Sequence, residues 1–102
     1  MKVEWLDEAR CEYRDLLQYY QTEVGTAYAR KFANQIMRAV EQLELFPESG
    51  VLKRDTLLGK HGFRALFIKQ YACIYRVEEN AVRIYHLTDA RKNYIYRIFG
   101  QN

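Results

Sequence analysis

The hydrophobic positions of the first half recur every three or four residues, which is the period of an amphipathic helix. One such stripe spans residues 6–24 and alternates with a charged, polar face. Gly25 is suited to end this helix and Thr26 to cap the next one. A second stripe predicts a helix over residues 27–46, so the two segments are expected to form an antiparallel helical hairpin.

Elsewhere the pattern has the period of two residues that strands require. A short strand is predicted at Lys2–Trp5, before the hairpin. After Pro47 a loop covers residues 51–61, and three runs rich in β-branched and aromatic residues follow at 63–69, 72–77 and 81–87. The connections between these runs are short enough for β-hairpins.

The element order is therefore strand, helix, helix and three strands, which predicts a two-layer α+β fold. We expect the last three strands to form an antiparallel meander, the first strand to join the sheet at an edge, and the helical hairpin to cover one face. The 102 residues are predicted to form a single domain, residues 1–102.

Composition supports a packed, water-soluble domain. Hydrophobic residues make up 49% and aromatic residues 15% of the chain, which excludes intrinsic disorder. The apolar runs, such as residues 65–68, are too short to span a membrane, and no apolar stretch follows Lys2 to suggest a secretory signal. Cys11 and Cys73 are too few for a disulfide scaffold, so we expect reduced thiols and a cytoplasmic location.

Charge is divided unequally between the two halves. Residues 1–50 carry six basic and nine acidic side chains, a net charge of −3, whereas residues 51–102 carry ten basic and four acidic ones, a net charge of +6. Such asymmetry is expected either from ordinary surface scatter or from a second half that faces an acidic partner, a nucleic acid or an acidic protein segment.

The chain lacks the residues that most catalytic and cofactor-dependent reactions need. The only serine, Ser49, lies in a turn without a nucleophile elbow, and no glycine-rich phosphate-binding loop is present. The two histidines and two cysteines have no zinc-ligand spacing. We therefore expect no metal, no nucleotide and no other small-molecule cofactor.

Metal-free RNA cleavage remains a possible chemistry, since it needs only an acid, a base and cations around the phosphate. The second half of the chain offers His86, Tyr94, Arg64 and Arg91 for these roles, and each also has a purely structural interpretation. The tail around Tyr96 interleaves basic and aromatic residues, a pattern that suits single-stranded nucleic acid and equally an acidic, disordered peptide.

Three segments of the chain together resemble the RelE/ParE superfamily of bacterial toxins from type II toxin–antitoxin systems. They are Gly62-Phe63-Arg64, residues 70–77 (QYACIYRV) and residues 86–94 (HLTDARKNY). The resemblance covers essentially the whole chain and implies the same order of elements and a cognate antitoxin protein as partner.

Two branches of this superfamily differ in their target. The RelE-like branch consists of ribosome-dependent endoribonucleases, whose catalytic arginine follows the tyrosine that opens the second strand of the meander. Ala72 occupies that position here, and the preceding strand offers only Arg64 and Lys69, although Arg91 matches the arginine after the last strand. Losing a cation that offsets transition-state charge costs several kcal/mol of catalysis.

The ParE-like branch keeps the fold, lacks this catalytic set and is described as poisoning DNA gyrase. We interpret the chain as a ParE-like toxin that inhibits gyrase by protein binding and is neutralised by an antitoxin whose disordered segment folds onto the domain. One alternative is a metal-independent messenger RNA endoribonuclease acting at the ribosome through Arg64, His86, Arg91 and Tyr94. A second is a non-toxic relative that retains only partner binding. The predicted partner-binding residues are Arg64, Lys69, Arg91, Lys92, Tyr94 and Tyr96.

Overall fold

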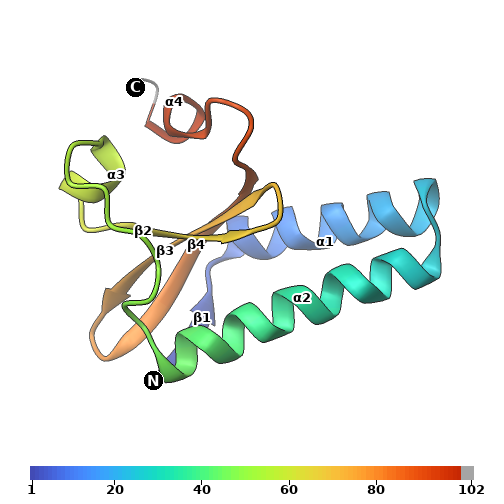
Figure 1. The fold of residues 1–102 in the computed structure, drawn as a ribbon, viewed down its shortest axis with the longest axis horizontal. Coiled ribbons are helices and arrows are strands. Elements are labelled where there is room, and N and C mark those ends of the chain that lie inside the picture. Colours follow the sequence, from blue (N-terminus) through green and yellow to red (C-terminus); the bar gives the residue numbers. More distant parts are fainter. Residues whose placement is uncertain (100–102) are drawn as a thin grey trace.

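A long helical hairpin and a four-stranded sheet make up most of the molecule (Figure 1). The computed structural model describes residues 1–99, apart from the side chains of Arg97 and Phe99. Its elements, in chain order, are β1 (Lys2–Trp5), α1 (Asp7–Glu23), α2 (Thr26–Leu45), α3 (Leu57–Lys60), β2 (Arg64–Ile68), β3 (Tyr71–Glu78), β4 (Ala81–Asp89) and α4 (Tyr94–Phe99).

The strands lie in the order β1-β4-β3-β2, with β1 at an edge as predicted. The last three strands form the expected antiparallel meander. β1, however, pairs in parallel with β4, so the sheet is mixed and the expectation of an antiparallel sheet holds only for the meander.

The direction of β1 follows from the path of the hairpin. α2 brings the chain back to the start of β1, where the amino group of Met1 donates a hydrogen bond to the carbonyl of Glu44 at 2.7 Å. β2 starts from that same end of the sheet. β3 runs antiparallel to β2, and β4 runs antiparallel to β3 and so in the direction of β2. β4 therefore lies parallel to β1 once the two are neighbours.

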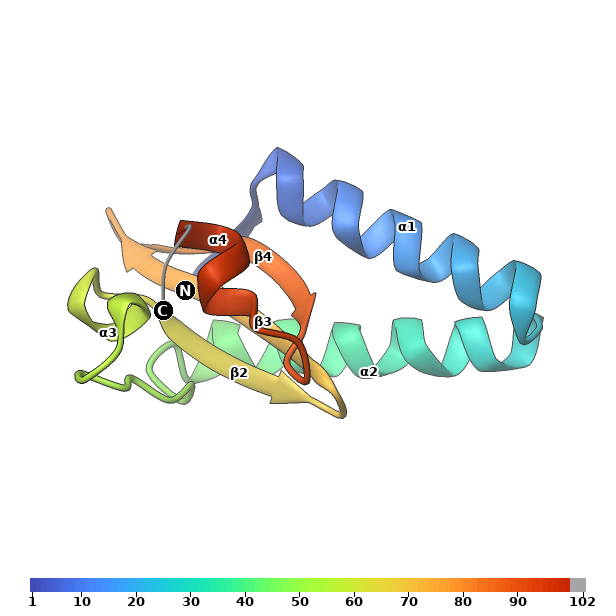
Figure 2. The same cartoon turned by 90° about the horizontal axis from the view of Figure 1, so that it is seen from above.

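The helical hairpin covers one face of the sheet, as the sequence predicts, and its far end extends beyond it (Figure 2). The core on this face joins apolar residues of α1 and α2 to β3 and β4, including Phe32, Ile36, Leu43, Tyr75 and Ile84. The turn between the helices departs from the prediction in one respect. Gly25, with a φ of 135°, is the residue before α2, and Thr26 is already helical.

Two short helices lie against the opposite face and were not predicted. α3 falls within the segment predicted as a loop, and α4 falls within the C-terminal tail. Leu58 of α3 packs with Ala65, Ala72 and Ile74 of the sheet, and Tyr94 of α4 packs against the same cluster. Both faces of the sheet are thus partly covered.

Within residues 1–99, no helix combines the length and apolar character that crossing a bilayer requires. Cys11 is exposed and Cys73 is buried, and neither forms a disulfide. Burial raises the pKa of the Cys73 thiol to about 12, so this thiol stays protonated and unreactive at neutral pH.

Candidate partner-binding surface

The Arg64 side chain binds to the loop that follows α2. Its guanidinium donates hydrogen bonds to the carbonyls of Glu48 and Gly50, at 3.1 and 3.0 Å, and lies 4.0 Å from the Glu48 carboxylate. These contacts fasten the segment after α2 to the start of β2. Arg64 therefore has a structural role in the connection between the two layers.

His86 lies at the edge of β4 that β1 leaves uncovered. β1 pairs with β4 only as far as Ile84, and the backbone N–H of Leu87 beyond it donates to the carboxylate of Glu12 on α1 at 3.0 Å. The same Glu12 oxygen lies 3.3 Å from His86 Nδ1. Glu12 of α1 thus takes part in a contact between α1 and β4.

Arg91 is paired with Asp89, the last residue of β4. The guanidinium donates two hydrogen bonds to the two carboxylate oxygens, at 3.0 and 2.7 Å, and the Arg91 backbone N–H adds a third at 2.9 Å. The Arg91 hydrogen bonds lower the pKa of Asp89 to about 2. The guanidinium remains largely exposed, so it can still face a partner.

The two tail tyrosines have different surroundings. Tyr94 is half-buried against the cluster that contains Leu58 and Ile74, and burial raises the pKa of its phenol. Tyr96 is 55% exposed, and its backbone N–H donates a hydrogen bond to the side-chain oxygen of Asn93 at 3.2 Å. Tyr94 therefore anchors α4, whereas Tyr96 is available on the surface.

The four residues predicted for RNA cleavage do not share one site. The strand register sets Arg64 opposite Tyr75, in the core under the helical hairpin, and His86 opposite Ile74, in the cluster on the other face. The β3–β4 register shifts between Ile74 and Tyr75, and beyond this irregularity His86 contacts Glu12 of α1, whereas Arg64 contacts the loop carbonyls of Glu48 and Gly50. Arg91 and Tyr94 have the separate partners given above.

The surroundings of Ala72 give a physical reason why this position does not hold the arginine of the RelE-like branch. The side chain is completely buried and packs with Leu58, Ala65 and Ile74 beneath the two short helices. A guanidinium at this position would need a charged partner inside an apolar cluster. The fold therefore uses this position for packing.

Some of the predicted partner-binding residues do gather at one end of the sheet. The backbone N–H of Ala90 donates to the carbonyl of Gln70 at 2.7 Å, which joins the β2–β3 turn to the segment after β4. Lys69, Arg91 and Lys92 lie on these two adjoining segments, and all three are exposed. We call this group the basic end. Arg64, at the opposite end of β2, is not part of it.

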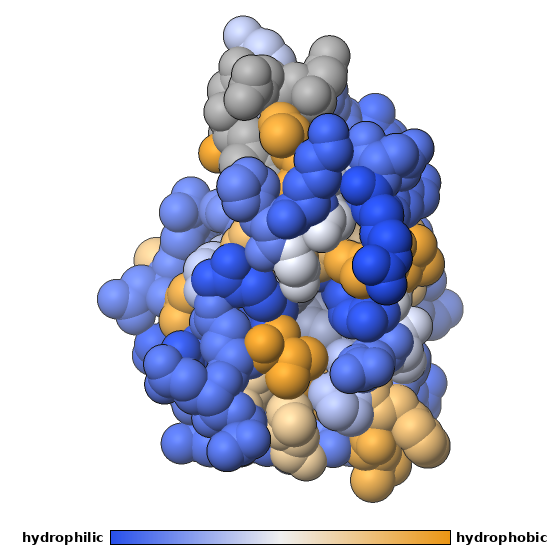
Figure 3. Space-filling view, turned by 90° about the vertical axis from the view of Figure 1, so that its left-hand side faces the viewer, coloured by the Kyte–Doolittle hydropathy of each residue, from blue (hydrophilic) through white to orange (hydrophobic). Residues whose placement is uncertain are grey.

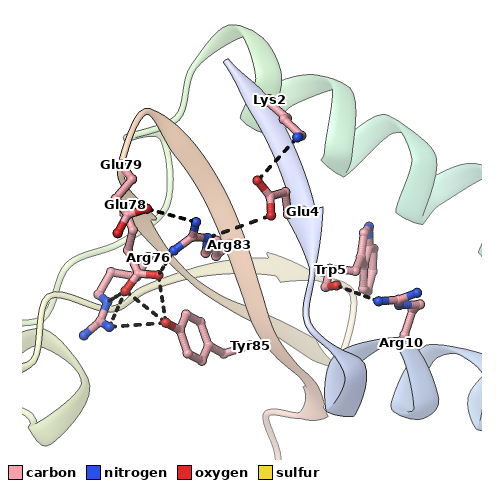
Figure 4. Close-up of polar contacts among 9 residues, drawn as sticks. All are labelled: Lys2, Glu4, Trp5, Arg10, Arg76, Glu78, Glu79, Arg83 and Tyr85. Carbon is pink, nitrogen blue, oxygen red and sulfur yellow. Dashed lines mark hydrogen bonds and ion pairs between the residues drawn. The ribbon is translucent and has the colours of Figure 1, made fainter.

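A polar network that the sequence did not reveal occupies the other end of the sheet (Figure 4). Glu78 accepts hydrogen bonds from Tyr85 at 2.8 Å and from Arg83 at 3.4 Å, and it also pairs with Arg76. The guanidinium of Arg76 lies 4.7 Å from the centre of the Phe63 ring, where it makes a cation–π contact. The only sequence signal was the alternation of charged residues along β3 and β4.

These pairs change the meaning of the charge asymmetry. Arg64, Arg76, Arg83 and Arg91 each have a carboxylate within 4.0 Å. These carboxylates therefore offset the charge of the arginines on the sheet. At the basic end, neither Lys69 nor Lys92 has a carboxylate of residues 1–99 within 4.0 Å. The side of the molecule in Figure 3 is dominated by hydrophilic side chains, with hydrophobic ones in small separate groups.

Comparison with protein families decides the assignment of the chain. A family model described as the ParE toxin of the type II toxin–antitoxin system parDE matches residues 3–94. The chain belongs to the ParE toxin family. The predicted resemblance to the ParE-like branch of the superfamily is thereby confirmed.

A solved structure agrees with this assignment at the level of the fold. The chain is similar to a chain from the "Chromosomal ParDE TA system from P. aeruginosa", with a TM-score of 0.72 and 19% sequence identity. The match covers 87% of this chain and 95% of that one. A search of curated proteins gave no match. The α+β fold predicted from the sequence is therefore a ParE fold.

Proposed function

We propose that this ParE family member is the toxin of a type II toxin–antitoxin pair, acts in the cytoplasm by binding DNA gyrase, and is neutralised by a cognate antitoxin. The observation that carries the proposal is the match of the ParE toxin model to residues 3–94. Because one fold can host several activities, the site geometry is needed to choose among them.

The side chains favour action by protein binding over RNA cleavage. Phosphoryl-transfer chemistry requires an acid, a base and cations aimed at one phosphate. Here Arg64 holds a loop, Arg91 pairs with Asp89, and His86 lies beside Glu12 at the uncovered edge of β4. The buried Ala72 removes the cation that the RelE-like branch uses.

The basic end supports an acidic, flexible antitoxin segment as one partner. Disordered segments that fold on binding can follow a large surface, and opposite charge speeds their association. Lys69 and Lys92 provide exposed charge, and Tyr96 adds an exposed aromatic surface on the same C-terminal segment. Arg91, although paired, adds its exposed guanidinium.

Three measurements test the proposal. Induced expression of the chain should arrest growth, and co-expression of the neighbouring small reading frame should restore it. The purified protein should inhibit gyrase supercoiling, while primer extension in a translating extract should show no messenger RNA cleavage. His86→Gln should retain growth arrest, because the proposed mechanism gives His86 no catalytic role.

The same measurements identify the alternatives. Cleavage of messenger RNA without any effect on gyrase would overturn the proposal in favour of the ribosome-dependent endoribonuclease. Growth without arrest, at expression levels verified by immunoblot, would indicate a relative that retains only partner binding.

A further inference from the structure

Three potential metal ligands from two distant parts of the chain meet beside the first turns of α1. Glu8 and Glu12 are four residues apart on α1, so their side chains lie on one face of the helix. His86 comes from β4. One ligand atom from each of the three lies within 4.8 Å of the other two.

The surroundings hold two of these ligands in place. The Glu12 carboxylate accepts the Leu87 backbone N–H at 3.0 Å, and only 28% of the side chain is exposed. The His86 ring is 17% exposed. Hydrogen-bonded carboxylates are typical of metal ligands, because the second partner fixes the orientation of the oxygen that binds the ion.

The spacing also suits a small divalent ion. His86 Nδ1 and Glu12 Oε1 are 3.3 Å apart. Two ligands bound to zinc at about 2.0–2.1 Å are roughly 3.3 Å from each other when the coordination is tetrahedral. Glu8 is exposed, so its carboxylate can rotate to complete a set of three protein ligands.

We propose that Glu8, Glu12 and His86 bind one divalent transition-metal ion, with Zn²⁺ as the best fit and water in the remaining position. Imidazole together with carboxylates favours zinc and its neighbours over Mg²⁺, which prefers oxygen ligands alone. On binding, the ion replaces any proton on Nδ1, and that proton leaves to solvent. The site is separate from the basic end and does not depend on the proposed function.

Such an ion would join α1 to the edge of β4. Beyond Ile84 this edge lacks a neighbouring strand, and the Glu12 carboxylate bridges it to α1. Because an ion that binds only the folded chain stabilises it by mass action, zinc should raise the unfolding temperature.

The test uses the full chain after treatment with a chelator and dialysis. Titration calorimetry with ZnCl₂ should show one site per chain, and the unfolding temperature should rise by about 5 °C at saturating zinc. Glu8→Gln and His86→Gln should each weaken binding at least tenfold and remove the temperature shift. MgCl₂ should produce neither effect in the unaltered protein.

Matched variants exclude other zinc-binding groups. Glu23→Gln lies on the same helix, His61→Gln removes the other histidine, and Cys11→Ser removes the exposed thiol. All three should bind zinc as the unaltered protein does. Equal zinc affinity in either Glu8→Gln or His86→Gln would overturn the proposal, as would loss of binding in Cys11→Ser or His61→Gln. Circular dichroism without zinc verifies that each variant is folded.

Discussion

Tyr75 shows how a single side chain connects the two layers. It is completely buried in β3, and its hydroxyl accepts the backbone N–H of Gly50 at 2.8 Å. A Cβ atom on Gly50 would lie 2.6 Å from that hydroxyl, so only glycine allows the close approach. Two residues that are 25 positions apart therefore depend on each other to fix the loop after α2.

Tyr75→Phe should lower the free energy of unfolding by about 1–3 kcal/mol, because the Gly50 N–H stays buried without its acceptor. Urea denaturation followed by circular dichroism measures the change. Tyr19→Phe is the matched control, since Tyr19 is 57% exposed, and it should stay within about 0.5 kcal/mol of the unaltered protein. Equal stability of the two variants would show that the hydrogen bond contributes little.

The residues of the candidate surface illustrate what a sequence can and cannot reveal about a site. Lys69, Lys92 and Tyr96 are exposed, as expected for lysines in connecting segments and for a tyrosine in the C-terminal tail. The partners of Arg64 are backbone carbonyls of the segment before β2, and backbone acceptors carry no side-chain signature in the sequence. The meeting of His86 with Glu12 depends on how α1 lies against β4, which periodicity does not specify.

At the scale of elements, the basic end arises because two connections adjoin. The β2–β3 turn and the segment after β4 are joined by the Ala90–Gln70 backbone hydrogen bond. Neither connection alone carries a dense charge cluster, since Lys69 lies on one and Arg91 and Lys92 lie on the other. Their meeting follows from the register that sets Tyr71 opposite Asp89.

Charge reversal at the basic end, Lys69→Glu with Lys92→Glu, should weaken antitoxin binding at least tenfold and reduce its dependence on salt. The proposed acidic antitoxin segment would then meet like charge. Surface plasmon resonance at low and high salt measures both effects. The matched control is Lys53→Glu with Lys60→Glu, which makes the same change in net charge away from the basic end. Equal loss in both double variants would assign the effect to net charge alone.

Long periodic elements were predictable, and short ones were not. The helical hairpin and the three strands of the meander follow from hydrophobic patterns that repeat along each element, and their observed ends lie within one or two residues of the prediction. α3 has four residues and α4 has six, too few to establish a helical period. The direction of β1 was not predictable from its own residues either, because alternation is the same in parallel and antiparallel strands.

At the scale of the whole molecule, paired carboxylates govern the response to acid. The pKa of Asp89 is about 2, and hydrogen bonds from Tyr85 and Arg76 lower the pKa of Glu78 despite its burial. A carboxylate with a lower pKa in the folded chain than in the unfolded chain stabilises the fold above its unfolded pKa. That contribution disappears as the pH falls toward the folded pKa.

We therefore expect the urea midpoint to be nearly constant from pH 7 to about pH 5 and to decline as the pH falls from there toward 2. Asp89→Asn should be less stable than the unaltered protein at pH 7 but should lose less between pH 5 and pH 2. Asp15→Asn, whose carboxylate is exposed, is the control. A decline as steep in Asp89→Asn as in the control would contradict the role given to Asp89.

The pairing of β1 with β4 has a consequence for the order in which the chain is made. The first strand needs the last one as its neighbour, and residues 6–80 must be synthesised between them. At typical elongation rates this takes about 4–15 s, during which β1 has no partner in the sheet. The nascent chain can form its helical hairpin early, since those contacts are local, but the sheet closes only after Asp89 has left the ribosome. Any activity that depends on the finished fold therefore begins only after β4 has emerged from the ribosome, and the last strand of the sheet sets that moment.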